Sequence, residues 1–257
     1  MRCRISSSRC RQTPSDAGRD AMKTSVPVLM YHKVGAEGQR FLNVGARDFA
    51  RQMRLLKRMG YQAVTFAAVI QGLFHGEPLP YRPVCITFDD GYCNVFDHAA
   101  PVLQSLGWAA TVFVPTAYVG GANTWDRQEG KPVLPIMGWT QLRALTDRGW
   151  ELAGHTHSHV RLDLLEDDLA RKEIADGCEA LREGAGAMVS TFCYPFGRYN
   201  ERTPRLVLDL GLQGACTTRS GLARASSSPA LLPRVKIAYR DRLPGFLYRL
   251  LIRCRAP

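Results

Sequence analysis

The sequence contains no hydrophobic run long enough to cross a membrane. No apolar stretch of the 257 residues reaches the ~18 residues that a spanning helix needs. Residues 1–24 are polar and rich in arginine and serine, without the apolar stretch of roughly 7 to 15 residues that a secretory signal requires. We therefore predict a cytoplasmic protein that begins with a disordered basic segment, residues 1–24, with Met22 as an alternative start.

The eight cysteines lack the spacing of a metal site or of a redox pair. None of them forms a CxxC motif, and Cys85, Cys193 and Cys216 lie in apolar surroundings. Buried cysteines of this kind behave as small hydrophobic residues. We interpret them as free thiols rather than as members of disulfides.

Acidic residues are scarce at both ends of the chain, which accounts for most of the net charge of +11. Residues 1–21 hold five arginines against two aspartates, and residues 242–257 hold four arginines and no acid. A nucleic-acid groove needs basic residues interleaved with aromatics across the folded body. We therefore expect no nucleic-acid partner.

Segment 242–257 is predicted to form a basic amphipathic helix. Its apolar stripe consists of Phe246, Leu247, Leu250, Leu251 and Cys254. Arg249 and Arg253 lie on the opposite side. Such a helix fits two roles: it can pack against the folded body, or it can contact the anionic surface of a membrane on its cytoplasmic face.

Apolar strands and amphipathic helices alternate along residues 25–241. Strands are predicted at 25–34, 63–66, 83–90, 109–116, 150–156, 190–197 and 214–218. Helices are predicted at 46–59, 94–106, 140–149, 164–185 and around Leu206 and Leu210. No internal repeat is visible. The alternation predicts a single α/β domain, either a barrel or a doubly wound parallel sheet.

Reactive side chains follow four of the predicted strands at the point where each strand ends. Asp89 and Asp90 follow one strand, and His155, Tyr194 and His32 follow three others. In both candidate architectures the carboxyl ends of the parallel strands meet at one edge, where active sites form. We expect these side chains to lie close together.

The histidines of "HTHSH", residues 155–159, predict a metal site. His155 and His159, four positions apart on a helical turn, can bind one ion, and Asp89 or Asp90 can complete a facial triad. His155 with His157 is an alternative pair, although we expect His157 to point elsewhere. One divalent ion is implied, with zinc favoured and cobalt, nickel or manganese compatible with the same ligands. Such an ion supports hydrolysis of an amide or ester, and the second acid can remove a proton from water.

Two motifs together resemble those of the polysaccharide deacetylases, carbohydrate esterase family 4. They are "TFDDGY" at 87–92 and "HTHSH" at 155–159, accompanied by "VLMYHKV" near the start, "YPFG" at 194–197 and "LPRV" at 232–235. The opening strand is similar to that of a branch whose first strand ends in "MYH". This resemblance implies a distorted (β/α) barrel of mainly parallel strands and metal-dependent removal of an acyl group from a sugar.

The resemblance also implies roles for individual residues. By position, Asp89 resembles the general base, Asp90 the metal-binding carboxylate, and His155 and His159 the metal histidines. Thr156 resembles a hydroxyl residue that steadies the loop between the histidines.

The sequence departs from the family pattern in two places. Cys193 stands where the family usually has an arginine that orients the base, and no histidine follows His159 to act as the general acid. In the "MYH" branch the early histidine looks like the replacement acid, so His32 is the candidate. Arg234 is the candidate to pair with Asp89.

Other residues are candidates for substrate contact. Tyr194 and Pro195 follow a predicted strand, and the backbone N–H of Tyr194 is a candidate oxyanion donor. Trp125, Trp139 and Trp150 could line a sugar groove, although packing in the core is the simpler interpretation for each of them.

The sequence therefore predicts a metal-dependent hydrolase that removes an N-acyl group, acetyl or formyl, from an aminosugar in a glycan or in a lipid-linked glycan precursor. Two alternatives are open. The same site could hydrolyse a non-sugar C–N bond, or the chain could be a non-catalytic protein of this fold that binds a glycan or a membrane.

Overall fold

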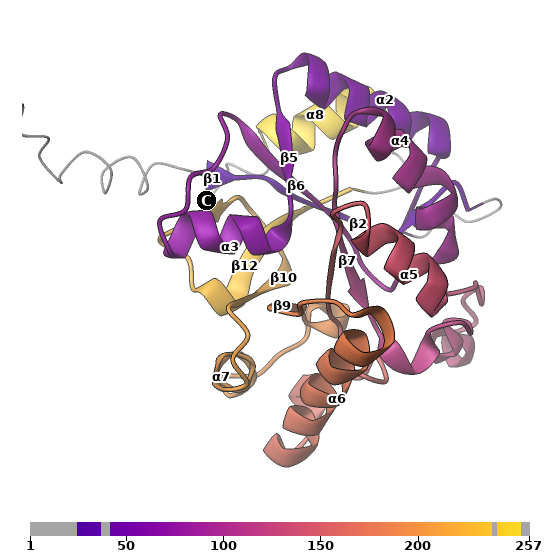
Figure 1. Cartoon of the computed structure of the whole chain (residues 1–257), viewed down its shortest axis with the longest axis vertical. Helices are drawn as coiled ribbons and strands as arrows, with labels where there is room; N and C mark the ends of the chain where they lie inside the picture. The colour runs from indigo at the N-terminus through magenta and orange to yellow at the C-terminus, as the bar shows by residue number, and fades with distance from the viewer. Residues whose placement is uncertain (1–24, 37–41, 238–240, 253–257) are drawn as a thin grey trace, which may run out of the picture.

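Seven parallel strands close into a barrel in the computed structural model, which describes residues 25–36, 42–237 and 241–252 (Figure 1). In order around the barrel the strands are β2 (Val28–Tyr31), β12 (Leu232–Lys236), β10 (Gly214–Ser220), β9 (Thr191–Cys193), β8 (Glu151–Gly154), β7 (Thr111–Val114) and β6 (Pro83–Phe88). The pairing of β6 with β2 closes the ring, and its pairs are all parallel. The predicted single-domain α/β barrel is confirmed, and the doubly wound sheet is not formed.

Short strands lie outside the ring. β5 (Gln62–Val64) pairs in parallel with the first residues of β6, Pro83 to Cys85. β1 (Ser25–Val26) pairs antiparallel with β11 (Ala223–Arg224), and β3 (Lys33–Val34) pairs with β4 (Asn43–Val44). The single strand predicted for 25–34 is therefore divided among three elements.

Helices surround the barrel (Figure 1). The α-helices are α2 (Ala46–Arg58), α3 (Phe66–Phe74), α4 (Ala100–Ser105), α5 (Trp139–Thr146), α6 (Asp167–Ala185), α7 (Thr203–Asp209) and α8 (Leu243–Leu251). Shorter helical segments are η1 (Val95–Ala99), η2 (Thr116–Tyr118), η3 (Thr124–Glu129), η4 (Leu162–Leu164), η5 (Pro195–Gly197) and η6 (Pro229–Leu231). α2, α5, α6 and α7 lie where helical periodicity predicted helices.

Alternation along the strands separates the interior of the barrel from the layer under the helices. One buried cluster takes a residue from each strand of the ring: Val28, Cys85, Phe113, Ala153, Cys193, Cys216 and Leu232. Because successive side chains of a strand point to opposite faces, residues an even number of positions further along also point inward. Asp89, His155 and Arg234 have this parity, which carries them to the mouth of the barrel.

α3 was not predicted from the sequence. A strand was expected at 63–66, whereas β5 ends at Val64 and α3 begins at Phe66. Thr65 caps the helix, because its hydroxyl accepts a hydrogen bond from the N–H of Ala68 at 3.2 Å. The predicted strand is therefore present as β5, but it ends two residues early, and Phe66 is the first residue of a helix.

β12 was also not predicted as a strand, although it completes the ring between β10 and β2. Its segment is short and contains Pro233, which cannot donate to a sheet and so weakens the strand pattern. Val235 aligns with Leu29 and Lys236 with Met30 in the parallel pair. This register sets the position of Arg234 inside the barrel.

α8 packs beside α2 on the outside of the barrel (Figure 1). Phe246 and Leu250, from the apolar stripe predicted for segment 242–257, are buried in the main core, and Leu247 is half-buried. This part of the stripe is used for packing. No helix of the described residues combines the length and apolarity needed to cross a bilayer.

Several sequence predictions fall outside the described residues. They concern the basic segment 1–24, with Cys3 and Cys10, and the end of the C-terminal segment, with Arg253 and Cys254. Within the described ranges the cysteines are free thiols, as predicted: Cys85, Cys93, Cys178, Cys193 and Cys216.

Candidate metal centre and active site

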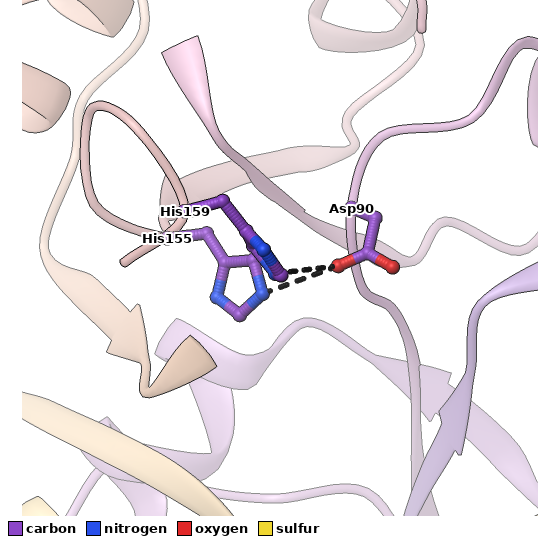
Figure 2. A group of neighbouring side chains, drawn as sticks. All are labelled: Asp90, His155 and His159. Atoms are coloured by element: carbon purple, nitrogen blue, oxygen red, sulfur yellow. Dashed lines mark ion pairs between the residues drawn. The ribbon is translucent and has the colours of Figure 1, made fainter. Parts of the chain in front are cut away.

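Asp90, His155 and His159 bring three potential metal ligands together at the mouth of the barrel (Figure 2). Oδ1 of Asp90 lies 3.3 Å from Nε2 of His155 and 3.2 Å from Nε2 of His159. All three residues are buried, and their ligand atoms lie within 4.8 Å of one another. Asp90 follows β6 and both histidines lie after β8, so barrel closure creates the group.

The histidine segment 155–159 is an irregular loop and not the helical turn that its spacing suggested. Thr156 and His159 have φ values of 62° and 53°, and Asp90 has a φ of 73°. Such left-handed conformations are uncommon outside glycine and cluster at functional sites. The loop turns back on itself, which places His159 beside His155.

α6 holds the histidine loop from behind. The backbone N–H of His157 donates to the carbonyl of Glu173, and that of Ser158 donates to the Glu173 carboxylate, both at 2.9 Å. A Cβ at Gly177 would lie 2.7 Å from the carbonyl carbon of Thr156, so only glycine allows this close approach. The Thr156 hydroxyl is buried and has no hydrogen-bond partner among the described residues, so it does not steady the loop as expected.

The surroundings of the two histidines fit a divalent metal ion. Nδ1 of His155 lies 2.7 Å from the carbonyl oxygen of Cys193. That nitrogen therefore carries the proton, and Nε2 presents its lone pair toward Asp90. The ring of His159 contacts the rings of Trp125 and Phe196, with centroid distances of 4.3 Å and 4.7 Å. Two imidazoles and one carboxylate match a facial triad with open positions.

The structure distinguishes the ligand sets that the sequence left open. Asp90, rather than Asp89, lies in the ligand group with His155 and His159. Nδ1 of His157 lies 3.0 Å from the hydroxyl of Thr116 instead. Burial alone would raise the pKa of Asp90, but hydrogen bonds with the two histidines outweigh burial and hold that pKa well below its usual range.

Asp89 and Arg234 form a second buried group beside the candidate metal ligands. Nη1 and Nη2 of Arg234 donate to Oδ1 and Oδ2 of Asp89 at 2.6 Å and 2.7 Å. The remaining donors of this fully buried guanidinium reach the Thr217 carbonyl and the Thr87 hydroxyl. Burial would raise the pKa of Asp89, but the charge of Arg234, helped by His32, outweighs burial and lowers it. Asp89 is therefore ionised at neutral pH.

Cys193 lies next to this ion pair, but its thiol does not take the place of either charged group. Nη2 of Arg234 lies 3.2 Å from Sγ of Cys193, and this sulfur lies 3.9 Å from Oδ2 of Asp89. Burial raises the pKa of Cys193 well above its usual range, so the thiol stays protonated. The arginine missing from this position is supplied by β12, and a thiol is small enough to leave room for it.

His32 lies at the same mouth, as the sequence predicted. Its Nε2 is 3.7 Å from Oδ2 of Asp89. Burial lowers the pKa of His32, while the charges of Asp89 and Asp90 oppose that effect. The side chain lines the same pocket as the candidate metal ligands, a position from which it can reach a bound substrate.

Tyr194 and Pro195 are less clearly placed for the role of oxyanion donor. The Tyr194 hydroxyl donates to the carbonyl of Ala230 at 2.9 Å, inside the core. The backbone N–H of Tyr194 points to the carbonyl of Cys216 at 3.4 Å, a long hydrogen bond within the sheet. Pro195 is buried at the start of η5 and has no N–H to donate. Tyr194 does line the pocket, so its contact with substrate stays a prediction.

A pocket of about 250 Å³ opens over the candidate metal ligands. Tyr92, Trp125 and Phe196 are among its aromatic lining residues. Trp150 is buried in the core and Trp139 packs against Gly184, so Trp125 is the tryptophan of the three candidates that reaches the pocket.

Three lysines that were not predicted from the sequence also line the pocket: Lys33, Lys131 and Lys236. Lys33 follows His32 directly, and Lys236 lies two positions after Arg234. The period of two along a strand could have identified Lys236, because it points to the same face as Arg234. Lys131 lies in a loop, where no periodic pattern marks it.

The comparison with known proteins agrees with this fold and site. The sequence model of the family described as polysaccharide deacetylase matches residues 76–215, which is more than half of the chain. The chain belongs to the polysaccharide deacetylase family. This match confirms the predicted family and the predicted class of enzyme, a carbohydrate deacetylase.

Individual relatives share moderate sequence identity with the chain. A Bacillus subtilis protein named as a polysaccharide deacetylase is 28% identical over 213 residues, covering 83% of this chain and 71% of that protein. The poly-beta-1,6-N-acetyl-D-glucosamine N-deacetylase of Escherichia coli is 27% identical over 256 residues, covering 87% of this chain but 38% of that enzyme.

Solved structures share the barrel. IcaB from Ammonifex degensii is 26% identical, with a TM-score of 0.76 over 88% of this chain and 97% of that one. A Streptococcus pyogenes deacetylase solved with acetate is 23% identical, with a TM-score of 0.75 over 91% of this chain and 99% of that one. At that level of identity the second match supports the fold alone.

Proposed function

We propose that this protein removes an N-acyl group, acetyl or formyl, from an aminosugar in a glycan or glycan precursor. The observation that carries the proposal is the proximity of two groups at one pocket. The ligand group Asp90, His155 and His159 lies beside the ionised carboxylate of Asp89, whose orientation is fixed by Arg234. Relatives named as N-acetylglucosamine N-deacetylases support the same chemistry.

One divalent metal ion is the proposed cofactor, held by Asp90, His155 and His159. When bound, such an ion lowers the pKa of a coordinated water and polarises an acyl carbonyl. Zinc suits two imidazoles and one carboxylate, and cobalt, nickel or manganese can use the same donors. The Cys193 carbonyl orients His155, and α6 supports the loop that carries His159.

Asp89 is the proposed general base. Its pKa is held low by Arg234, so the carboxylate is ready to accept a proton from the attacking water. The bidentate contact also prevents the carboxylate from turning toward the metal ligands, which explains why neighbouring acids divide between two roles. Arg234 is in this proposal a positioning residue.

His32 is the proposed general acid that protonates the departing amine. Its imidazole lines the pocket and lies 3.7 Å from Asp89, so the two groups face the same reacting atoms. Proton transfer between them returns the site to its starting state after the amine leaves.

The first test is direct. Purified protein loaded with zinc is incubated with N-acetylated glucosamine oligomers, with an N-formyl analogue and with simple N-alkyl acetamides, and the released acid and amine are quantified. Release from the sugars but not from the simple amides supports the proposal. Preference for the amides would favour the non-sugar amidase, and a lack of turnover with metal bound would favour a non-catalytic glycan-binding protein.

We also propose peripheral contact with an anionic membrane surface, through a site different from the predicted stripe. Phe246 and Leu250 of that stripe are buried. A groove of about 530 Å³ lies between α2 and α8, lined by Arg51, Arg54, Lys57, Arg58, Leu106 and Leu243. We call it the α2/α8 groove. Its cations would attract anionic headgroups, which would bring a lipid-linked substrate close to the enzyme. The cytoplasmic location stays a prediction.

A further inference from the structure

We propose that the pocket binds an aminosugar that carries an anionic group, a phosphate or a carboxylate, next to its acylated nitrogen, and that Lys33 and Lys236 bind this anion. The inference rests on the proposed deacylation of an aminosugar and specifies the class of sugar. Both lysines line the pocket that contains Asp89, Asp90 and the two histidines.

Lys33 is a buried lysine with no carboxylate in direct contact among the described residues, although the charges of Asp90 and Asp126 act on it from a greater distance. The residue is 3% exposed, and its Nζ lies 5.0 Å from the centre of the Tyr92 ring. Among the described residues no carboxylate is within ion-pair distance of this ammonium group. A charge removed from water normally needs a partner. The free side of Lys33 faces the pocket, so a ligand anion can be that partner.

Lys236 places a second cation at the same mouth of the barrel. It comes from β12, the strand that pairs with β2. It is the last residue of β12 and has the inward parity of Leu232 and Arg234. Its strand register places it beside Met30, two residues before His32. In the part of the chain that the structure describes, Lys236 is also outside every ion pair, and its side chain is exposed.

Two other charged groups at the pocket already have partners of opposite charge. Arg234 pairs with Asp89, and Nζ of Lys131 lies 3.4 Å from Oδ1 of Asp126. Asp90 faces two imidazoles that are neutral when they act as ligands, so its charge offsets one of the two remaining lysines, whereas a bound divalent ion would add two positive charges. Lys33 and Lys236 therefore give the pocket a net positive character, and a concave site concentrates such a field.

This positive character is poorly suited to a neutral sugar polymer. Deacylation produces a cationic amine, which two lysines without carboxylate partners would repel. An anionic group on the same sugar reverses the balance, because it attracts the substrate and remains attached to the product. A phosphate or carboxylate also accepts charge-assisted hydrogen bonds from lysine, which are stronger than bonds between neutral groups.

The experiment compares substrates that differ only in charge. The zinc-loaded protein is given an N-acetyl aminosugar as its 1-phosphate, as its uronic acid, as its phosphodiester to a short lipid in micelles, and as its neutral methyl glycoside. We expect kcat/KM for at least one anionic form to exceed that for the neutral glycoside by about 10-fold or more, mainly through KM. The anionic form that performs best distinguishes a free sugar phosphate, a carboxylate and a lipid-linked phosphate.

Substitutions of the two lysines test whether they cause the preference for an anionic substrate. Lys33→Gln and Lys236→Gln are each expected to lower the ratio of anionic to neutral kcat/KM by about 5-fold to 10-fold. Lys236→Arg keeps the charge and should keep the preference. Lys172→Gln, on the exposed surface of α6, is the matched control and should leave the ratio unchanged. If Lys33→Gln does not fold, the exposed Lys236 variants still test the proposal.

The outcomes separate this inference from the proposed function. Turnover of the neutral glycoside with no anionic preference, or a ratio unchanged in both glutamine variants, overturns the anion site and leaves deacylation intact. If no substrate turns over, calorimetry with the non-acylated aminosugar 1-phosphate decides. Weaker binding to Lys33→Gln or Lys236→Gln than to the unaltered protein supports the site, and equal binding overturns it.

Discussion

Arg234 of β12 and Asp89 at the end of β6 form a buried bidentate ion pair although they are 145 positions apart in the chain. β2 lies between their strands in the ring, so the contact spans the interior of the barrel. It places a fully buried guanidinium beside Cys193, the position at which the sequence resemblance led us to expect an arginine. Because Arg234 reaches Asp89 only when the barrel is closed, barrel closure is linked to the charge state of the proposed base.

The first prediction concerns the pH dependence that this pair imposes. Lysine at position 234 keeps a charge but loses the bidentate geometry, so Arg234→Lys should raise the pKa of Asp89. The acidic limb of kcat/KM, which reports the ionised base, should then move to higher pH. Arg224→Lys, on the exposed end of β11, is the control. If the acidic limb of kcat/KM stays at the same pH in both variants, Arg234 does not set the pKa of the base.

The same pair makes stability depend on pH. Because the pKa of Asp89 is lowered in the folded protein, its contribution is complete above the unfolded value of about 3.9 and is lost as pH falls toward the folded value. The free energy of unfolding of Arg234→Lys should therefore fall less steeply in acid than that of the unaltered protein. Denaturant titrations at several pH values measure the difference.

Asp89→Asn should separate catalysis from metal binding. The amide keeps the shape of the carboxylate but cannot accept a proton, and Asp89 lies outside the ligand group. Turnover should fall by about 10²-fold to 10⁴-fold while bound zinc stays at the level of the unaltered protein. Acid release and metal content are measured on the same preparation. Full activity in this variant would remove Asp89 from the mechanism.

Asp90→Ala and His157→Ala should differ in metal content. Asp90 contributes one of the ligand atoms of the group, whereas His157 contacts Thr116. Elemental analysis should find no bound metal in Asp90→Ala and nearly full occupancy in His157→Ala. Added zinc should raise the melting temperature of His157→Ala but not that of Asp90→Ala, because a ligand stabilises only the state that binds it. Loss of metal in His157→Ala would point to the other histidine pair.

Gly177→Ala should lower the unfolding free energy, whereas the same substitution inside an ordinary helix usually raises it. Alanine in a helix interior is usually more stable than glycine by roughly 0.5–1 kcal/mol. Here the added Cβ would lie 2.7 Å from the backbone of Thr156 and would displace the histidine loop. We expect a loss of about 1–3 kcal/mol in unfolding free energy and weaker zinc binding. Glu183→Ala, exposed on the same helix, should change neither, and a more stable Gly177→Ala would contradict the close packing.

The α2/α8 groove should bind anionic vesicles. We expect the protein to sediment with vesicles that contain phosphatidylglycerol at low salt and to remain in solution with phosphatidylcholine alone. Each basic residue near an anionic surface contributes about 1 kcal/mol, so the double variant Arg51→Glu and Arg54→Glu should lower binding by more than about 10-fold. Arg171→Glu with Lys172→Glu, on α6, is the charge-matched control. Equal loss in both double variants would indicate a general charge effect.

Much of the fold was predictable because its signals are local. Apolar alternation before Asp89 and after Trp150 identified β6 and β8, and helical periodicity identified α2 and α6. α3 was missed because its nine residues include one polar side chain, Gln71, so the segment has no polar face to mark a helical period. β12 was missed because its five residues include a proline, and its pairing partner β2 is about 200 residues earlier in the chain.

The sequence by itself determined which residue types reach the mouth of the barrel, because Asp89, Asp90, His155 and His159 follow strands whose apolar pattern is complete within a few residues. Only the tertiary structure decided that Asp90 joins the histidines, that Arg234 holds Asp89, and that Lys33 and Lys236 line the same pocket. The physical reason is strand register. Pairing between distant strands fixes which inward side chains meet, and no local pattern in the chain records that pairing.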